Sequence, residues 1–175
     1  MNINKIMIFI DGSNLFKGSK RKGFQFSYEK LINILKADRN IVRMYYYSGR
    51  KVPTSSNQKR YFKMLKKLGI EVITTPLKKR EIECGKCKHK EWIDIEKGVD
   101  ASLSTDLLWY ALQNAYDKAI LLSGDADFLP AVKRVRLLGK NVELWAFKSS
   151  LAPELKTEAD SCIIIDDYID KIKKE

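Results

Sequence analysis

Two aspartates, Asp125 and Asp127, lie one residue apart directly after the apolar run Ala119–Leu122. The residues that follow have helical periodicity, so this stretch predicts a strand-to-helix turn, which is where parallel α/β sheets bind ligands. Two carboxylates this close repel each other unless a positive charge lies between them, and a divalent cation is the usual partner. The structural alternative is that Asp127 caps the helix that begins near Phe128.

Acids also mark two other predicted elements. Asp11 ends the apolar run Ile6–Ile10, and Asp100 lies in the first turn of a helix predicted over residues 99–116. In a doubly wound sheet the carboxyl ends of central strands lie side by side, so these acids can converge in one crevice. The sequence therefore predicts a magnesium or manganese site for phosphoester chemistry, with Asp11, Asp100 and Asp125 as ligands and Asp127 completing the catalytic set.

Two further polar residues near these acids are secondary candidates. Asn14 follows Asp11 and can hydrogen-bond a carboxylate or a phosphate, although Ser13 or Asn14 could equally be an ordinary helix cap. Asp106 lies six residues after Asp100, which places it about 240° around the helix. Because the two do not share a face, Asp106 ranks below the other four acids.

The positive charge of the chain is unevenly distributed. Its formal net charge is +11, with +6 in residues 1–49, +8 in residues 50–97 and −3 in residues 98–175. A basic front half joined to an acidic back half suits a protein that holds a polyanion by its backbone and keeps acids at one spot. The alternative is that the excess lysines are simply solvated surface.

One predicted helix concentrates this positive charge. It begins within residues 53–56 and ends at Leu68, and its apolar side carries Tyr61 and Leu65. Its other side carries Lys59, Lys63, Lys66 and Lys67. Helical spacing puts these four side chains along one line, so they predict a stripe that binds a phosphate backbone, or else a solvated helix face.

Residues 77–97 depart from the alternation of strands and helices. Two arms of roughly alternating polarity flank the sequence "CGKCKH", which predicts an inserted, protruding β-hairpin. Cys84, Cys87 and His89 have the spacing of zinc ligands, but a structural zinc site needs four. The fourth ligand would come from elsewhere in the chain or from the second subunit of a homodimer. The alternative is an exposed basic hairpin with free thiols.

Several other chemistries are excluded by residue type. The chain has a single histidine, His89, so a two-histidine ribonuclease mechanism and a Ser-His-Asp triad are both ruled out. No GxxxxGK[ST] loop is present, which argues against a P-loop nucleotidase. A phosphatase with an aspartyl nucleophile would carry Asp-x-Asp after the first strand, and here Ser13 occupies the second acidic position.

The remaining pattern predicts a single α/β domain over residues 1–175. Buried strands are expected at residues 5–11, 41–47, 70–75, 119–122, 141–147 and 162–165, and further helices at 28–36, 128–138, 152–159 and 166–174. Three tyrosines, Tyr45, Tyr46 and Tyr47, end the second strand, where they could pack in the core or stack on bases. No apolar run is long enough for a membrane span or a signal peptide core, so a cytoplasmic location is expected.

Three separated motifs resemble one known family. The stretches "MIFIDGSN", "KGVDASLSTDLL" and "AILLSGDADFLPAVKRVRLLGKNVELWAF" are together similar to the NYN domain family, the LabA-like branch of the PIN-like nuclease fold. The resemblance implies a PIN-like three-layer α/β/α fold with a mostly parallel central sheet, and metal-dependent cleavage of RNA. It also implies that the family's acids match Asp11, Asp100, Asp125 and Asp127, and that further recurrent polar positions match Asn14, Ser123 and Asp106.

These observations predict a magnesium- or manganese-dependent ribonuclease that cleaves RNA endonucleolytically. Single-stranded or structured RNA is the expected partner, and no membrane partner is expected. The residues expected to contact RNA are Asn14, Ser123, Lys59, Lys63, Lys66 and Lys67. A non-catalytic RNA- or nucleotide-binding regulatory module of the same fold is the alternative, and a regulator acting through other proteins is a third hypothesis.

Overall fold

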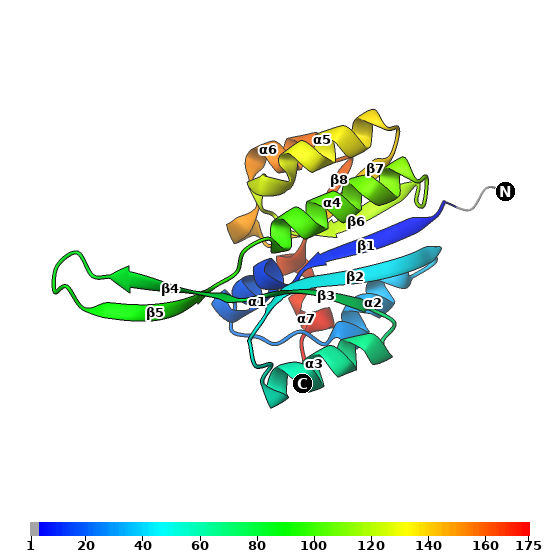
Figure 1. The fold of residues 1–175 in the computed structure, drawn as a ribbon. Helices are drawn as coiled ribbons and strands as arrows, with labels where there is room; N and C mark the ends of the chain where they lie inside the picture. Colours follow the sequence, from blue (N-terminus) through cyan, green and yellow to red (C-terminus); the bar gives the residue numbers. More distant parts are fainter. Residues whose placement is uncertain (1–3) are drawn as a thin grey trace.

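A six-stranded parallel sheet forms the centre of the protein, as the computed structural model of residues 4–175 shows (Figure 1). The strand order is β3-β2-β1-β6-β7-β8, and each neighbouring pair is parallel. The strands are β1 (Ile6–Asp11), β2 (Ile41–Arg50), β3 (Glu71–Pro76), β6 (Lys118–Leu122), β7 (Asn141–Ala146) and β8 (Ser161–Ile164). The predicted mostly parallel sheet is confirmed.

Helices cover both faces of this sheet (Figure 1). One face packs against α1 (Gly12–Arg21), α2 (Tyr28–Lys36), α3 (Ser56–Lys67) and α7 (Ile169–Ile172), and the other against α4 (Val99–Leu112), α5 (Leu129–Leu137) and α6 (Pro153–Glu158). Strand β1 contributes Ile8 and Ile10 to one core and Met7 and Phe9 to the other. Burial on both faces explains why the strand is continuously apolar. Within residues 4–175, none of the helices combines the length and apolar character of a membrane span.

The segment after β1 differs from the sequence-based expectation. Residues 12–21 form a full helix, α1, which is not among the helices expected from the sequence. Its cap is neither Ser13 nor Asn14. Instead Asp11 caps the helix, because its Oδ1 accepts a hydrogen bond from the Asn14 N–H at 3.0 Å. Asp11 therefore both ends β1 and caps α1.

Two other expectations are decided by burial and backbone conformation. All three tyrosines of β2 are at most 3% exposed, which confirms packing rather than base stacking for Tyr45, Tyr46 and Tyr47. Helix α4 ends at Leu112, earlier than expected, because the chain turns at Asn114, which has a positive φ of 54°.

A two-stranded antiparallel hairpin projects away from the sheet (Figure 1). It consists of β4 (Lys78–Glu83) and β5 (Lys90–Ile95), and most of its side chains are exposed. Its position between β3 and α4 agrees with the insertion expected at residues 77–97.

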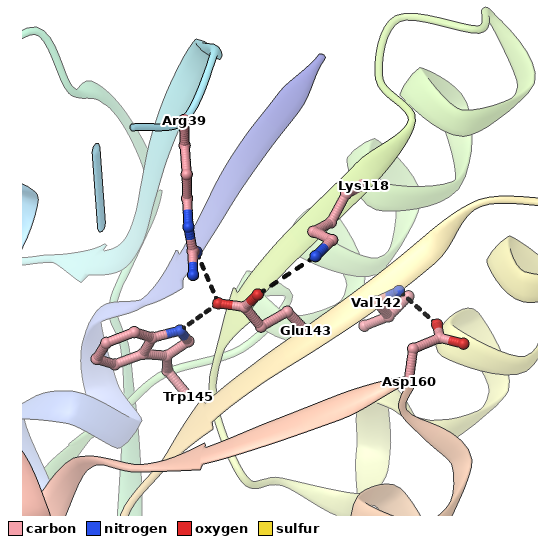
Figure 2. Close-up of polar contacts among 6 residues, drawn as sticks. All are labelled: Arg39, Lys118, Val142, Glu143, Trp145 and Asp160. Atoms are coloured by element: carbon pink, nitrogen blue, oxygen red, sulfur yellow. Dashed lines mark hydrogen bonds and ion pairs between the residues drawn. The ribbon is translucent and has the colours of Figure 1, made fainter. Parts of the chain in front are cut away.

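A buried glutamate joins three elements toward the amino ends of the strands. Glu143 of β7 is 3% exposed, and its Oε1 accepts hydrogen bonds from Arg39 Nη1 and Trp145 Nε1, both at 2.8 Å (Figure 2). Lys118 Nζ lies 3.6 Å from Oε2. Burial acts to raise the pKa of Glu143, but the hydrogen bonds and positive charges outweigh it and hold this pKa below its usual range. The ionised glutamate therefore stabilises the folded chain.

We expect Glu143→Ala to lower the free energy of unfolding by about 2–4 kcal/mol at neutral pH, because Arg39 and Trp145 lose a buried acceptor. The folded-state pKa is lowered, so this contribution is complete above the ordinary value of 4.5 and is lost as the pH falls through the lowered value. Urea unfolding at neutral pH and at about pH 3 measures the difference.

Glu81→Ala is the matched control, because it removes an exposed partner of Lys90 at 3.3 Å on the hairpin. Its effect should be small at both pH values. Equal losses for the two variants would contradict a stabilising role for the buried network.

Candidate active site

Asp11 is the buried acid of the candidate site. It ends the central strand β1 and is 3% exposed. Its Oδ1 accepts from the Asn14 N–H at 3.0 Å, and its Oδ2 accepts from Ser123 Oγ at 2.9 Å. Burial, with smaller contributions from the charges of Asp100 and Glu96, raises its pKa to about 6 against the lowering effect of these two hydrogen bonds. Asp11 is thus held in place, and no side chain among residues 4–175 forms an ion pair with it.

Acids from two other segments interact electrostatically with Asp100, which lies in the first turn of α4. Partial burial raises the pKa of Asp100, and the charges of Asp125, Glu96 and Asp127 raise it too, whereas Lys17 lowers it. Asp125 and Asp127 follow β6, and Glu96 follows the hairpin. Asp11, Asp125 and Asp127, the other three aspartates selected from the sequence, therefore all interact electrostatically with Asp100.

The turn after β6 is organised by its own hydrogen bonds. Ser123 is fully buried, donates to Asp11 and accepts from the Asp125 N–H at 3.2 Å. Asp125 caps a short 3-10 helix, Ala126–Phe128, since its Oδ1 accepts from the Asp127 N–H at 3.1 Å. Helix α5 has no side-chain cap, so the capping alternative for Asp127 is wrong. Because Ser123 has no exposed surface, it positions Asp11 instead of facing a substrate.

A cleft of about 440 Å³ lies between this turn and α1. Asp125 lines it on one side, and Asn14, Lys17 and Arg21 of α1 line it on another. Gly124 allows the chain at Ser150 to close the cleft, because a Cβ at this position would lie 2.5 Å from the Ser150 carbonyl oxygen. One acidic and two basic side chains, those of Asp125, Lys17 and Arg21, therefore line the same cavity.

Glu96 is a fifth acid that sequence reasoning missed. It follows β5 and accepts hydrogen bonds from Ser13 Oγ and the Gly49 N–H. Its charge raises the pKa of both Asp11 and Asp100. Its position four residues before Asp100 could have indicated a role in the site. However, Glu96 falls within residues 77–97, which were assigned to the hairpin insertion.

The donor atoms of the site suit a hard divalent cation. Magnesium and manganese prefer carboxylate oxygens, and a bound cation would counter the burial and the charge crowding that raise the pKa of Asp11 and Asp100. In the conformation described for residues 4–175, no group of three or more His, Cys, Asp or Glu side chains meets the geometry of a metal site. Shared coordination of one cation would therefore require a rearrangement of side chains, and Asp100 and Asp125 are exposed.

The other predicted site residues lie at different distances from this cluster. Asp106 accepts a hydrogen bond from the Tyr47 hydroxyl at 2.8 Å, on the side of α4 that faces β2. The lysines of α3 are exposed, as expected for either a phosphate-binding stripe or a solvated face. Because α3 leads from the carboxyl end of β2 to the amino end of β3, Lys59 lies nearest the acid-bearing edge and Lys67 farthest from it.

The hairpin tip forms a compact turn around its cysteines. The Cys84 N–H donates to the His89 carbonyl at 2.8 Å, and the Lys88 N–H donates to the Cys84 carbonyl at 3.0 Å. Backbone N–H groups of Cys87 and Lys86 hydrogen-bond the Cys84 sulfur and lower its pKa. Both thiols are exposed. A lowered pKa favours the thiolate, the form that binds zinc.

Removal of the buried charge at Asp11 should stabilise the protein. The folded-state pKa is raised from 3.8 to about 6, so the folded chain is penalised as the pH rises through this window and carries the full cost above it. We expect Asp11→Asn to raise the free energy of unfolding by up to about 3 kcal/mol at slightly alkaline pH, with no gain below about pH 4. Urea unfolding across this range, without divalent cations, measures the gain.

Asp167→Asn is the matched control for this experiment, because Asp167 is exposed and lies outside the acid cluster. It should show no gain that grows with pH. A less stable Asp11→Asn protein at alkaline pH would contradict the electrostatic account of Asp11.

The zinc site at the hairpin stays a prediction. We expect reduced protein, purified without a histidine tag, to contain stoichiometric zinc that Cys84→Ser removes and Cys162→Ser, in β8, does not. Elemental analysis of the three proteins measures this. Absence of zinc from the reduced wild-type protein would reject the site and leave an exposed basic hairpin with free thiols.

Comparisons with known proteins agree with this architecture. The chain is 27% identical over 175 residues to the low amplitude and bright protein LabA of Synechococcus elongatus, covering 98% of this chain and 89% of LabA. It is 38% identical over 69 residues to the uncharacterized protein y4oD of Sinorhizobium fredii, covering 38% of this chain and 32% of y4oD. The crystal structure of VPA0982, a protein of unknown function from Vibrio parahaemolyticus, has the same fold, with a TM-score of 0.76 and 21% identity over 98% of this chain and 97% of that one. A family model described as the NYN domain matches residues 5–166, so the chain belongs to the NYN domain family of ribonuclease-like nucleases.

Proposed function

We propose that this protein is a metal-dependent endoribonuclease whose active site comprises the acids around Asp11 and Asp100 and the cleft lined by Asp125. The observation that carries the proposal is the charge crowding among the acids of this site. The pKa of Asp100 is raised by burial and by Asp125, Glu96 and Asp127, and it is lowered by Lys17 of α1. Crowded acids facing a basic helix suit a site that takes a divalent cation and a phosphodiester together.

Asp11, Asp100 and Asp125 are the proposed metal ligands, with Asp127 beside them. Magnesium or manganese bound there would polarise the scissile phosphate and lower the pKa of a water, so that hydroxide can attack near neutral pH. The protein's own part is to hold the acids. The Asn14 N–H and the buried Ser123 hydroxyl fix the two oxygens of Asp11.

Lys17 and Arg21 are the proposed contacts to the RNA backbone at the cleft. Both lie on α1, line the cleft that contains Asp125, and have no ion-pair partner among residues 4–175. Their charge is therefore available to phosphate oxygens. Contacts of this kind position RNA without reading its sequence and weaken as the salt concentration rises.

Endonucleolytic cleavage is supported by the exposure of the site. Asp100, Asp125 and Asp127 are all exposed, so a strand can reach them from the side without threading a free end. The exposed lysines of α3 extend the positive surface away from the acids. Together these features favour binding within a strand over capture of its terminus.

We expect Asp125→Asn to reduce RNA cleavage at least about a hundredfold while the protein remains folded, because the side chain keeps its shape but loses the charge. The assay follows a single-stranded RNA with magnesium or manganese, with a chelator control. Asp167→Asn, an exposed acid outside the cluster, should cleave at the wild-type rate.

Further variants separate the roles within the site. Asp11→Asn should behave like Asp125→Asn, and Asp106→Asn should have a milder effect. Lys63→Ala should raise the apparent Kd for RNA without abolishing turnover. Cleavage that survives both the chelator and Asp125→Asn would indicate a contaminating nuclease, whereas tight RNA binding without cleavage under any divalent cation would favour the non-catalytic RNA-binding module.

A further inference from the structure

A second cavity lies on the other side of α1 from the cleft lined by Asp125, Asn14, Lys17 and Arg21, which we call the acid cleft. Its volume is about 560 Å³, within the range of small-molecule sites. Its walls come from α1, the α1–α2 connection, α2, α3 and the C-terminal segment. The aromatic residues that line it are Phe16, Phe24, Phe26, Tyr28 and Tyr61. Such a wall offers ring surface on which a planar group can stack.

The polar atoms of this wall are already bonded to one another. Tyr61 donates its hydroxyl hydrogen to the Tyr46 hydroxyl at 3.0 Å, and Tyr28 lies within hydrogen-bonding reach of the same pair. Burial raises the pKa of Tyr28 and Tyr61, so both phenols are neutral. Phe16, by contrast, is 66% exposed at the rim. The cavity therefore presents apolar rings rather than free hydroxyls.

The charged residues that line the cavity are both basic. They are Lys20 of α1 and Lys174, whose backbone N–H donates to the Gln25 carbonyl at 2.8 Å and holds the C-terminal segment in place. Neither lysine side chain has an ion-pair partner within residues 4–175, whereas the neighbouring Lys22 pairs with Asp166 and Lys173 pairs with Asp170. These two charges are free to meet an anionic ligand.

Helix α1 separates this cavity from the acid cleft and contributes to both. Asn14, Lys17 and Arg21 line the cleft, whereas Phe16 and Lys20 line the cavity. An α-helix is about 10–12 Å across with its side chains, so a short stretch of a polymer can reach both sites. Tyr46 also connects the two sites. Its hydroxyl accepts a hydrogen bond from Tyr61 of the cavity, and its ring packs against Gly12, next to Asp11, where a Cβ would lie 2.4 Å from the ring.

We propose that the aromatic cavity is a nucleobase subsite for the RNA strand whose phosphate lies in the acid cleft, an inference that rests on the proposed function. A base stacks on the ring of Phe16 and enters the aromatic wall, while Lys20 and Lys174 contact flanking phosphates. The combination identifies the occupant. A purely apolar partner would leave two lysines unmatched, and a bare anion would leave the rings unused. A nucleotide within a strand uses both.

The test measures binding of two fluorescent oligoribonucleotides of equal length in a chelator, so that neither is cleaved. One is oligoadenylate, and the other is the abasic strand with the same phosphates. We expect Phe16→Ala to weaken oligoadenylate binding about tenfold and leave abasic binding unchanged, because it removes a stacking surface only. Lys20→Ala should weaken both strands equally and reduce the salt dependence.

Trp109→Ala is the matched control, since Trp109 is an aromatic residue that is 54% exposed on α4, on the opposite face of the sheet. It should bind both strands as the wild type does. Phe16→Ala is also mild for folding, because its side chain is largely in solvent.

Wild-type binding tests the proposed function separately from the subsite. If wild-type protein binds oligoadenylate and Phe16→Ala binds it equally well, or loses the same affinity for the abasic strand, the base subsite is wrong while the ribonuclease proposal stands. If the wild-type protein binds neither strand, the base subsite is wrong, and the cleavage assay with magnesium or manganese decides the ribonuclease proposal separately.

Discussion

The buried carboxylate of Asp11 is the constraint on which the candidate site depends. Two hydrogen bonds orient it, from the first turn of α1 and from the end of β6, yet burial and neighbouring acids still raise its pKa to about 6. A carboxylate in this environment costs folding free energy when it is ionised. This cost arises at the carboxyl edge of the sheet, where strand ends bring the acids together. A bound cation would reduce it.

A network that stabilises the fold and the residues proposed for catalysis lie at opposite ends of the sheet. Toward the amino ends of the strands, Glu143 is fully compensated by Arg39, Lys118 and Trp145 (Figure 2). At the carboxyl edge, burial and the charges of Asp125, Glu96 and Asp127 outweigh the opposing charge of Lys17 and raise the pKa of Asp100. The same sheet therefore has a buried acid paired with positive charges toward its amino ends and a group of mutually repelling acids at its carboxyl edge. Helix α1 connects the unsatisfied end to the surface that we propose for RNA, because its sides line both the acid cleft and the aromatic cavity.

The strands and most helices follow from local patterns in the sequence. Continuous apolar runs such as Ile6–Ile10 identify strands buried on both faces, and helix α2 has the bounds that its apolar stripe predicts. The placement of acids at strand ends follows from the same topology. The start of α1 was not predicted, because Asp11 serves both as a site residue and as a helix cap, and the first role obscured the second.

Other features depend on contacts between distant segments, which no local pattern encodes. Glu96 belongs to the site because Ser13 and Gly49 hydrogen-bond it, although its neighbours in sequence form a hairpin. Ser123, which was expected to contact RNA, is fully buried and donates a hydrogen bond to Asp11. The aromatic cavity brings Phe16 together with Tyr61 and Lys174.

The central claim is that the acids around Asp11 are held for a divalent cation. The most direct measurement is anomalous diffraction from a crystal soaked in manganese. The account predicts an anomalous peak in contact with Asp125 and at least one of Asp11 and Asp100, with those side chains drawn together. A crystal with no manganese peak at these carboxylates, at saturating manganese, would contradict it.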